Sequence, residues 1–391
     1  MSVAMPGCRR DELLPGCRGR KMERPLSRRA LLAGLSASAL LTRTAGSQAA
    51  ETGWEDGAPP EWDRVLTAAR AEGQVTVAGF PLLEEKMSAA FQRDAGIKLN
   101  FLSSNTAEQS ARLEAEARAK NLTIDILLGG GRELGPMMKE GLLEPVKPQL
   151  ILPGISPANF REGRLKWMDN SSQYLLQGAE YVFGWLLVNK DIVDPKEITT
   201  WRDLLDPKYR GKIASYDLRS PGPGQGSAAW IYNTFGMDYI KALFLDQQVK
   251  FSTDNRQLVE MVARGTTPIV FGAIQTEVER FKSAGFANLA VVLPEDAPGY
   301  LTGGYSVLKQ AKGVPHPKAA TVFINWYMSR PGQEVYESVM LETSRRIDLH
   351  TGLPEYLVPR PGVKYYEAFN EDEYFSRYDV VKLITNALGN R

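Results

Sequence analysis

Short apolar runs alternate with helical segments along the chain from residue 75 onward. The runs 75–80, 97–102 and 124–128 are rich in β-branched and other apolar residues, which is typical of buried strands. Between them, 82–94 and 106–120 carry helix-forming residues, and the second segment is rich in alanine. The order strand, helix, strand, helix, strand predicts a parallel sheet.

A second alternating set occupies the middle of the chain. Its strands are expected at 212–216, 249–252, 268–271 and 290–292. The strand-like segments 180–189 and 300–308 lie where the chain would cross to this set and return. The roughly 340 residues after residue 50 exceed the usual size of a single core. We therefore predict an α/β protein of two lobes, 51–182 with 296–391 in lobe 1 and 183–295 in lobe 2, each a mixed, mainly parallel sheet flanked by helices.

The loops after the strands of the first set are small, polar or rich in glycine. In open α/β sheets, ligands bind beyond the carboxyl ends of the strands, so these loops are candidate ligand contacts. The candidate residues in them are Phe80, Ser103, Ser104, Asn105, Gly130, Gly131 and Arg132.

The stretch RSPGPGQGS at 219–227 joins a predicted strand to a predicted helix. It lacks the lysine of a nucleotide-binding P-loop, and its G-x-G-x-G spacing with an internal proline does not fit a dinucleotide site. A helix N-terminus with an arginine beside it remains, which suits a carboxylate or a phosphate. An ordinary turn is an equal alternative. The candidate residues here are Arg219, Ser220, Gly222 and Gly224.

The N-terminal region resembles an export signal. A twin-arginine pair at 28–29 precedes the apolar run 30–41, and small residues typical of a cleavage site follow at 45–50. The run is too short to span a bilayer, which needs about 20 residues. We expect residues 1–50 to be removed from a periplasmic protein, whether translation starts at Met1, Met5 or Met22.

Removal of this signal changes the composition that matters. Cys8 and Cys17 both lie within it, so the remaining chain has no cysteine for disulfides, thiolate metal sites or nucleophilic catalysis. Of 47 basic and 46 acidic residues, 9 and 3 lie in 1–50, which leaves a net charge of −5 on the rest. Without a long basic tract, nucleic acid is not an expected partner.

The chain resembles the extracellular solute-binding proteins of ABC importers. The stretches that carry the resemblance are DILLGGGRELGPMMKEGLLEP, VNKDIV, TTWRDLLDPKYRGKIAS and KAATVFINWYMSRPGQEVY. It implies a type II periplasmic-binding fold, in which two lobes joined by two crossing strands close on a ligand. It also implies a monomer that binds a small molecule without a cofactor and docks on an inner-membrane permease.

This group includes receptors for several classes of ligand, and the residues of this chain favour some of them over others. Ferric receptors bind iron through adjacent tyrosines on the loop that corresponds to 271–277, and that loop has no tyrosine. The only Tyr-Tyr pair, 365–366, lies in a C-terminal extension where we expect it to pack. His316 and His350 do not indicate a metal site. We therefore do not expect iron.

Polyamine receptors hold cations with acidic residues and aromatic walls. Asp217, Asp254 and Glu277 would supply charge, but Arg132 and Arg219 stand on the same strand-end loops. An anion is therefore favoured: an organic carboxylate, a phosphonate or a phosphorylated compound.

The candidate ligand-binding set is completed by Tyr181, Tyr305 and Gln275, two of them on the predicted crossing strands. No recognisable catalytic set is present, because cysteine is absent after residue 50 and the two histidines are isolated. We therefore expect a binding protein and not an enzyme. A sensor subunit that reports its ligand to a receptor kinase would need the same cleft and stays an alternative.

Overall fold

The computed structural model describes residues 53–131, 136–349 and 352–389. The first sheet has the strand order β2-β1-β3-β14-β6-β5, and β4 also pairs with β14. β1 runs parallel to β2 and β3, whereas β14 is antiparallel to β3. Its strands are β1 Gln74–Gly79, β2 Lys98–Ser103, β3 Ile126–Gly129, β4 Leu143–Glu144, β5 Lys166–Trp167, β6 Leu176–Gln177 and β14 Val307–Ala311.

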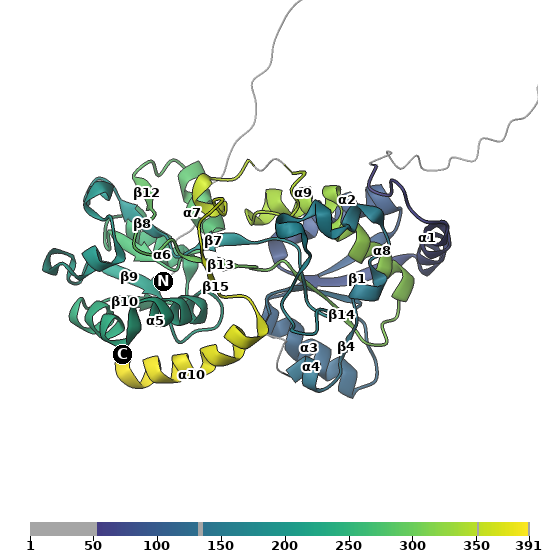
Figure 1. The fold of residues 1–391 in the computed structure, drawn as a ribbon, viewed down its shortest axis with the longest axis horizontal. Coiled ribbons are helices and arrows are strands. Elements are labelled where there is room, and N and C mark those ends of the chain that lie inside the picture. Colours follow the sequence, from purple (N-terminus) through teal and green to yellow (C-terminus); the bar gives the residue numbers. More distant parts are fainter. Residues whose placement is uncertain (1–52, 132–135, 350–351, 390–391) are drawn as a thin grey trace, which may run out of the picture. The chain divides into compact units, whose positions relative to one another are not determined.

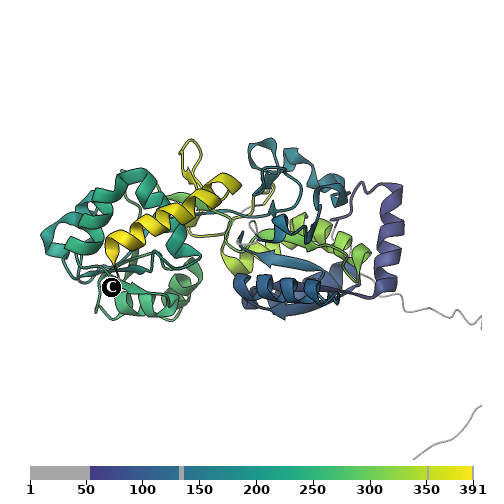
Figure 2. The ribbon, with the colours of Figure 1, turned by 90° about the horizontal axis from the view of Figure 1, so that it is seen from below.

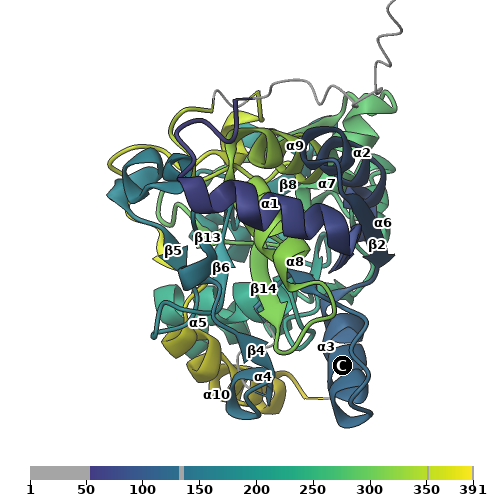
Figure 3. The ribbon, with the colours of Figure 1, turned by 90° about the vertical axis from the view of Figure 1, so that its right-hand side faces the viewer.

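Helices cover this sheet and complete the first lobe. They are α1 Pro60–Glu72, α2 Glu84–Ala95, α3 Thr106–Arg118, α4 Pro136–Lys139, α8 Pro317–Met328 and α9 Arg330–Met340. Every residue of α8 from Ala319 to Met328 is buried, because α1 packs on the outside of a helix that already contacts β1 (Figure 3). This explains why α8 is mostly apolar, with its two buried polar side chains, Thr321 and Asn325, both bonded to Gln149.

The second lobe is built on the sheet β10-β9-β11-β8-β12. β9 is parallel to β10 and β11, and β8 is antiparallel to β11 and β12. Its strands are β8 Leu186–Asn189, β9 Ile213–Tyr216, β10 Lys250–Ser252, β11 Ile269–Phe271 and β12 Leu289–Val292, and its helices are α5 Pro223–Lys241, α6 Asn255–Ala263 and α7 Gln275–Ser283. Short 3₁₀ turns occupy much of 147–163 and 195–209.

A small sheet, β15-β13-β7, lies between the two larger sheets (Figure 1). β7 Tyr181–Phe183 leads from the first lobe into β8, and β13 Tyr300–Thr302 leads back into β14. The two strands are antiparallel, and β15 Tyr366–Glu367 adds to β13. The predicted fold class, with its two lobes and two crossing strands, is thereby confirmed.

The last helix that the structure describes is α10 Glu371–Leu388. It packs against α5, and Val380, Ile384 and Leu388 belong to the apolar core of the second lobe. The assignment of 296–391 to lobe 1 stays a prediction, and α10 contacts the cores of both lobes. The remaining lobe boundaries stay a prediction.

Within the described residues, no helix is both long and apolar enough to cross a membrane. The predicted export signal, residues 1–50, lies outside the described residues.

Candidate functional site

A cavity of about 400 Å³ is lined by both lobes, by the crossing strands and by α10; we call it the interlobe cavity. Its lining residues are Asn105, Gly130, Gly131, Tyr181, Phe183, Tyr216, Pro221, Gly222, Pro223, Gln225, Gly226, Asn255, Ile274, Tyr300, Thr302, Gly304, Tyr305, Ala368, Phe369, Tyr374, Arg377 and Tyr378. A volume of this size suits a small-molecule ligand.

The helices α3, α5, α6 and α7 all begin at this cavity, because Asn105, Gly222, Asn255 and Ile274 line it at or next to their first residues. The N-cap residues of α5 and α7, Gly222 and Ile274, have no side chain able to cap a helix. Helix N-termini carry partial positive charge and unsatisfied amides. The starts of α3 and α6 are capped by Asn105 and Asp254, so the uncapped starts of α5 and α7 are the ones that favour a negative charge in the cavity.

The charged side chains around the cavity also favour a negatively charged ligand. Among the lining residues that the structure describes, none is acidic and Arg377 is the only cation. Behind the wall, the ammonium of the buried Lys309 donates to the carbonyl of Gly130 at 2.6 Å. The cavity is therefore suited to a negatively charged group more than to a cation.

Tyrosines supply much of the wall, and their phenols are uncharged. Burial raises the pKa of Tyr305 to about 12, and burial also raises the pKa of Tyr181, Tyr216 and Tyr300. These side chains therefore offer hydroxyl groups as donors at neutral pH. Tyr305 is held by a stacked contact with Phe80, with ring centroids 4.4 Å apart.

A buried acid supports the wall at Tyr305 from behind. Glu342 accepts from the backbone N–H of Tyr305 at 3.3 Å and from the hydroxyl of Tyr336 at 2.5 Å. Burial raises the pKa of Glu342 to about 8. A Cβ at Gly304, whose φ is +50°, would lie 2.0 Å from Glu342 Oε1, so glycine is required at that position.

Six of the residues predicted from sequence line the interlobe cavity: Asn105, Gly130, Gly131, Tyr181, Gly222 and Tyr305. Asn105 also caps α3, since its Oδ1 accepts from the N–H of Glu108. Arg132 lies outside the described residues. The ligand contacts of all these residues stay predictions.

The structure places the other candidates away from the lining. Phe80 stands behind Tyr305, and the hydroxyls of Ser103 and Ser104 bond to Glu84 and to the carbonyl of Leu102. The amide of Gln275 donates to the carbonyl of Met340 in a buried position. Of these side chains, Phe80 supports the wall through its contact with Tyr305, and the ligand contacts of all four stay predictions.

Arg219, predicted as an anion contact, is paired with Asp217 and is not among the lining residues, and its contact with a ligand stays a prediction. Its Nε and Nη2 each donate to the carboxylate of Asp217 at 2.8 Å, and its guanidinium lies 5.2 Å from the ring centre of Phe251. Its Nη1 donates to the carbonyl of Gly389 just after α10. Asp217, only two residues away, thus takes the guanidinium that we expected beside the start of α5.

Gly224, another predicted ligand contact, lies against the backbone of Asp217. A Cβ there would lie 1.9 Å from the carbonyl oxygen of Asp217. Glycine is needed for the close approach of two backbone segments, and a contact of Gly224 with a ligand stays a prediction. Ser220, whose carbonyl accepts from the N–H of Gln225, likewise belongs to the turn and not to the lining.

Sequence reasoning missed the contribution of α10 and of several strand ends. Tyr216 ends β9, and the rule that placed candidates after the strands of the first lobe would have found it. Phe369, Tyr374, Arg377 and Tyr378 gave no such signal, because nothing in the sequence shows which part of the molecule α10 covers. The Tyr365–Tyr366 pair packs as expected: Tyr365 is buried and Tyr366 donates to Glu373.

Metal ligands do not gather in the described residues, where no group of three or more His, Cys, Asp or Glu side chains is placed to hold an ion. His316 has a structural partner, because its Nδ1 lies 2.9 Å from Oδ2 of the buried Asp125. His350 lies outside the described residues.

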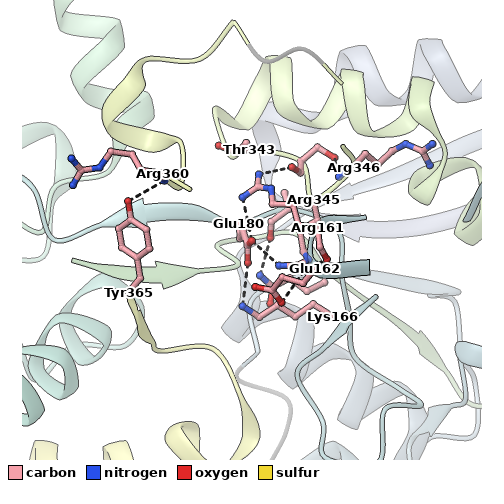
Figure 4. Close-up of polar contacts among 12 residues, drawn as sticks. Arg161, Glu162, Lys166, Glu180, Thr343, Arg345, Arg346, Arg360 and Tyr365 are labelled. Atoms are coloured by element: carbon pink, nitrogen blue, oxygen red, sulfur yellow. Dashed lines mark hydrogen bonds and ion pairs between the residues drawn. The ribbon is translucent and has the colours of Figure 1, made fainter. Parts of the chain in front are cut away.

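A cluster of charged side chains, most of them buried, lies where the chain enters the crossing strands (Figure 4). The carboxylate of Glu180, directly before β7, lies 3.2 Å from Arg161, 3.1 Å from Lys166 and 2.6 Å from Arg345. Burial alone would raise the pKa of Glu180, but the three cations lower it. Lys166 also reaches Glu367 on β15 at 2.6 Å, so one ammonium ties β5 to two strands of the small sheet.

The fold and this cavity are those of a two-lobe binding protein. Residues 86–339 match the family of bacterial extracellular solute-binding proteins, and the chain belongs to that family. The predicted resemblance is thereby confirmed, and the family and its structural neighbours are binding proteins and not enzymes.

Three similar proteins illustrate what the chain resembles in sequence and in structure. An uncharacterized protein of Haemophilus influenzae is 28% identical over 283 residues, 69% of this chain and 77% of that protein. A Trichodesmium protein (IdiA, FutA) in complex with iron and citrate has a TM-score of 0.63 at 16% identity, covering 82% of this chain and 100% of that chain. The periplasmic binding protein AfuA of Actinobacillus pleuropneumoniae, with fructose-6-phosphate bound, has a TM-score of 0.61 at 18% identity, covering 81% and 98%. At these identities the two structures share the fold.

Proposed function

We propose that this protein captures a small organic anion in the interlobe cavity and delivers it to an inner-membrane ABC permease. The anion would be a carboxylate, a phosphonate or a phosphorylated compound. One observation carries the proposal: several helices begin at a cavity whose described lining has no acidic side chain. Each such N-terminus favours a nearby negative charge by about 0.3–1 kcal/mol, and more where it is partly buried.

The similar structures include a receptor with a sugar phosphate bound, which supports this class of ligand. They also include a complex with iron and citrate. The loop 271–277, where ferric receptors of this group carry adjacent tyrosines, has no tyrosine in this chain, and no group of three or more His, Cys, Asp or Glu side chains gathers in the described residues. The organic anion is therefore the better match to this cavity.

A polyamine would find aromatic walls, because six tyrosines are among the described lining residues. It would find no carboxylate in that part of the lining to balance its ammonium groups. For this reason we place polyamines behind anions.

A thermal-shift screen of the purified protein tests the proposal. The probes are inorganic phosphate, methylphosphonate, citrate, fructose-6-phosphate, spermidine and ferric citrate. A ligand at 100 times its Kd stabilises the folded state by about 2.7 kcal/mol, which raises Tm by several degrees. We expect such a rise with at least one iron-free anion. A rise with spermidine alone, or a visible charge-transfer band with ferric citrate, contradicts the proposal.

Export is a separate part of the proposal. The twin-arginine pair and apolar run within residues 1–50 lead us to propose secretion through a twin-arginine signal. Replacing Arg28 and Arg29 by lysine is expected to leave the precursor in the cytoplasm, as measured by cell fractionation. Normal secretion of that double variant would rule out this type of signal.

A further inference from the structure

Helix α10 begins in the apolar core of the first lobe. Phe369, just before the helix, and Tyr374 in its second turn pack in the cluster that contains Met168 and Leu175. The carboxylates of Glu371 and Asp372 accept from the backbone and side-chain N–H groups of one first-lobe residue, Asn170, at 2.6 and 2.9 Å.

The other end of α10 is fixed to the second lobe. Val380, Ile384 and Leu388 are buried in the second core, against α5. The carbonyl of Gly389 accepts from Arg219 at 3.2 Å, which places a cation at the C-terminal end of the helix. Figure 2 shows α10, in yellow, lying along the second lobe and reaching toward the first. The helix thus links the two lobes.

The turn between these anchors faces the interlobe cavity with Arg377 and Tyr378. Arg377 is only 8% exposed. Its Nη2 donates to the carbonyl of Ala368 and lies 3.8 Å from Oε1 of Glu373. Its buried Nε has no hydrogen-bond partner within the described structure. The guanidinium is thus held at the cavity wall by one backbone carbonyl and by a long contact with Glu373.

Glu373 does not neutralise this cation closely. Its Oε2 accepts from the hydroxyl of Tyr366 at 2.5 Å, and its other oxygen has no hydrogen-bond partner among the described residues. At 3.8 Å, the Arg377–Glu373 contact is longer than a hydrogen bond. By contrast, Arg219 makes two bonds of 2.8 Å to Asp217.

We propose that Arg377 is the residue that selects anionic ligands, by donating from its guanidinium to the carboxylate, phosphonate or phosphate of the bound solute. This inference rests on the proposed function and identifies the cation that serves it. The match to the solute-binding family ends at residue 339, so the selecting residue lies on an element outside the matched region.

Calorimetric titration of the full chain with fructose-6-phosphate, citrate and inorganic phosphate tests this assignment. Arg377→Gln is compared with Lys382→Gln, which removes the same charge from a position of α10 that is 76% exposed. For each probe that binds the unaltered protein, we expect a loss of affinity of roughly tenfold to a hundredfold in Arg377→Gln, the range for hydrogen bonds to charged groups. We expect less than a twofold change in Lys382→Gln.

Arg377→Lys separates recognition from a purely structural role. It keeps the charge but loses the planar set of donors, so we expect a several-fold loss, smaller than in Arg377→Gln. A structural role would instead lower the ligand-free Tm and leave the affinity of folded protein unchanged. If Arg377→Gln does not fold, Arg377→Lys alone decides, and unchanged affinity in it overturns the assignment.

The two proposals fail in different ways. If no anion binds the unaltered protein, both the proposed function and the role of Arg377 are overturned. If an anion binds equally well to the unaltered protein and to folded Arg377→Gln, only the role of Arg377 is overturned.

Discussion

The turn that leads into α5 and the helix α10 each carry an arginine near the interlobe cavity, and the two arginines have opposite surroundings. Arg219 is bound by a carboxylate two residues away, and its Nη1 donates to the carbonyl of Gly389 at the end of α10. Arg377 lines the cavity, and its contact with the nearest carboxylate among the described residues, that of Glu373, is a long one of 3.8 Å. A cation close in sequence to an acid is easily paired locally, whereas a cation placed by tertiary packing can remain available to a ligand.

The strongest test of this comparison removes the packing that positions α10. Ile384→Ala deletes a fully buried side chain and is expected to lower the free energy of unfolding by about 2–5 kcal/mol. Leu383→Ala, at a neighbouring residue that is 48% exposed, is expected to change it by less than about 0.5 kcal/mol. Denaturant titration measures both. Equal effects would show that α10 does not dock in the second core.

The second test concerns the turn. Gly224→Ala would bring a Cβ to 1.9 Å from the carbonyl oxygen of Asp217, so we expect a loss of roughly 1–3 kcal/mol in unfolding free energy. Gly154→Ala is the matched control, because its Cβ would meet nothing within 4 Å. A Gly224→Ala protein of unchanged stability but weakened anion binding would show that the ligand contacts this turn.

Neither arginine accounts for a third expected effect, which comes from Glu342. Burial raises the pKa of the Glu342 carboxyl from its ordinary value of 4.5 to about 8 in the folded chain. Between these two pH values, the folded chain holds a proton that the unfolded chain releases. Stability should therefore be greatest below pH 4.5 as far as this group is concerned, and should fall by at most about 1.4 kcal/mol per pH unit up to about pH 8.

Melting curves at several pH values check this. Glu342→Gln is expected to lose that part of the pH dependence, while Arg219 and Arg377 variants keep it. A Glu342→Gln protein with the unaltered pH profile would contradict the assignment.

The smallest effect is expected from Arg219→Gln on ligand binding. Because this guanidinium is engaged by Asp217 outside the described lining, calorimetric affinity for an anion should change by less than twofold. Loss of this partly exposed Arg219–Asp217 ion pair should lower the free energy of unfolding by at most about 1 kcal/mol. A tenfold loss of affinity would remove the distinction between the two arginines.

The fold could be predicted from the sequence because local patterns determine it. The runs at 75–80 and 97–102 became β1 and β2 within one residue. β1 is buried along nearly its whole length, as expected of a strand in a parallel sheet, and β2 pairs with it as the edge strand. The strand-end rule also found Asn105 and Gly130 in the lining. What it could not find was Arg377, whose position depends on where an amphipathic helix docks, and this is decided by packing between distant segments.

The ion cluster at Glu180 has a consequence for how this sequence can change over time. Removing the carboxylate of Glu180 would leave buried cations without their shared partner, at a cost of about 3–5 kcal/mol, whereas replacing the group together with apolar residues is often tolerated. Single substitutions at Glu180 should therefore be rare in the lineage of this protein. Among its descendants, the residues around Glu180 should be inherited together or exchanged together.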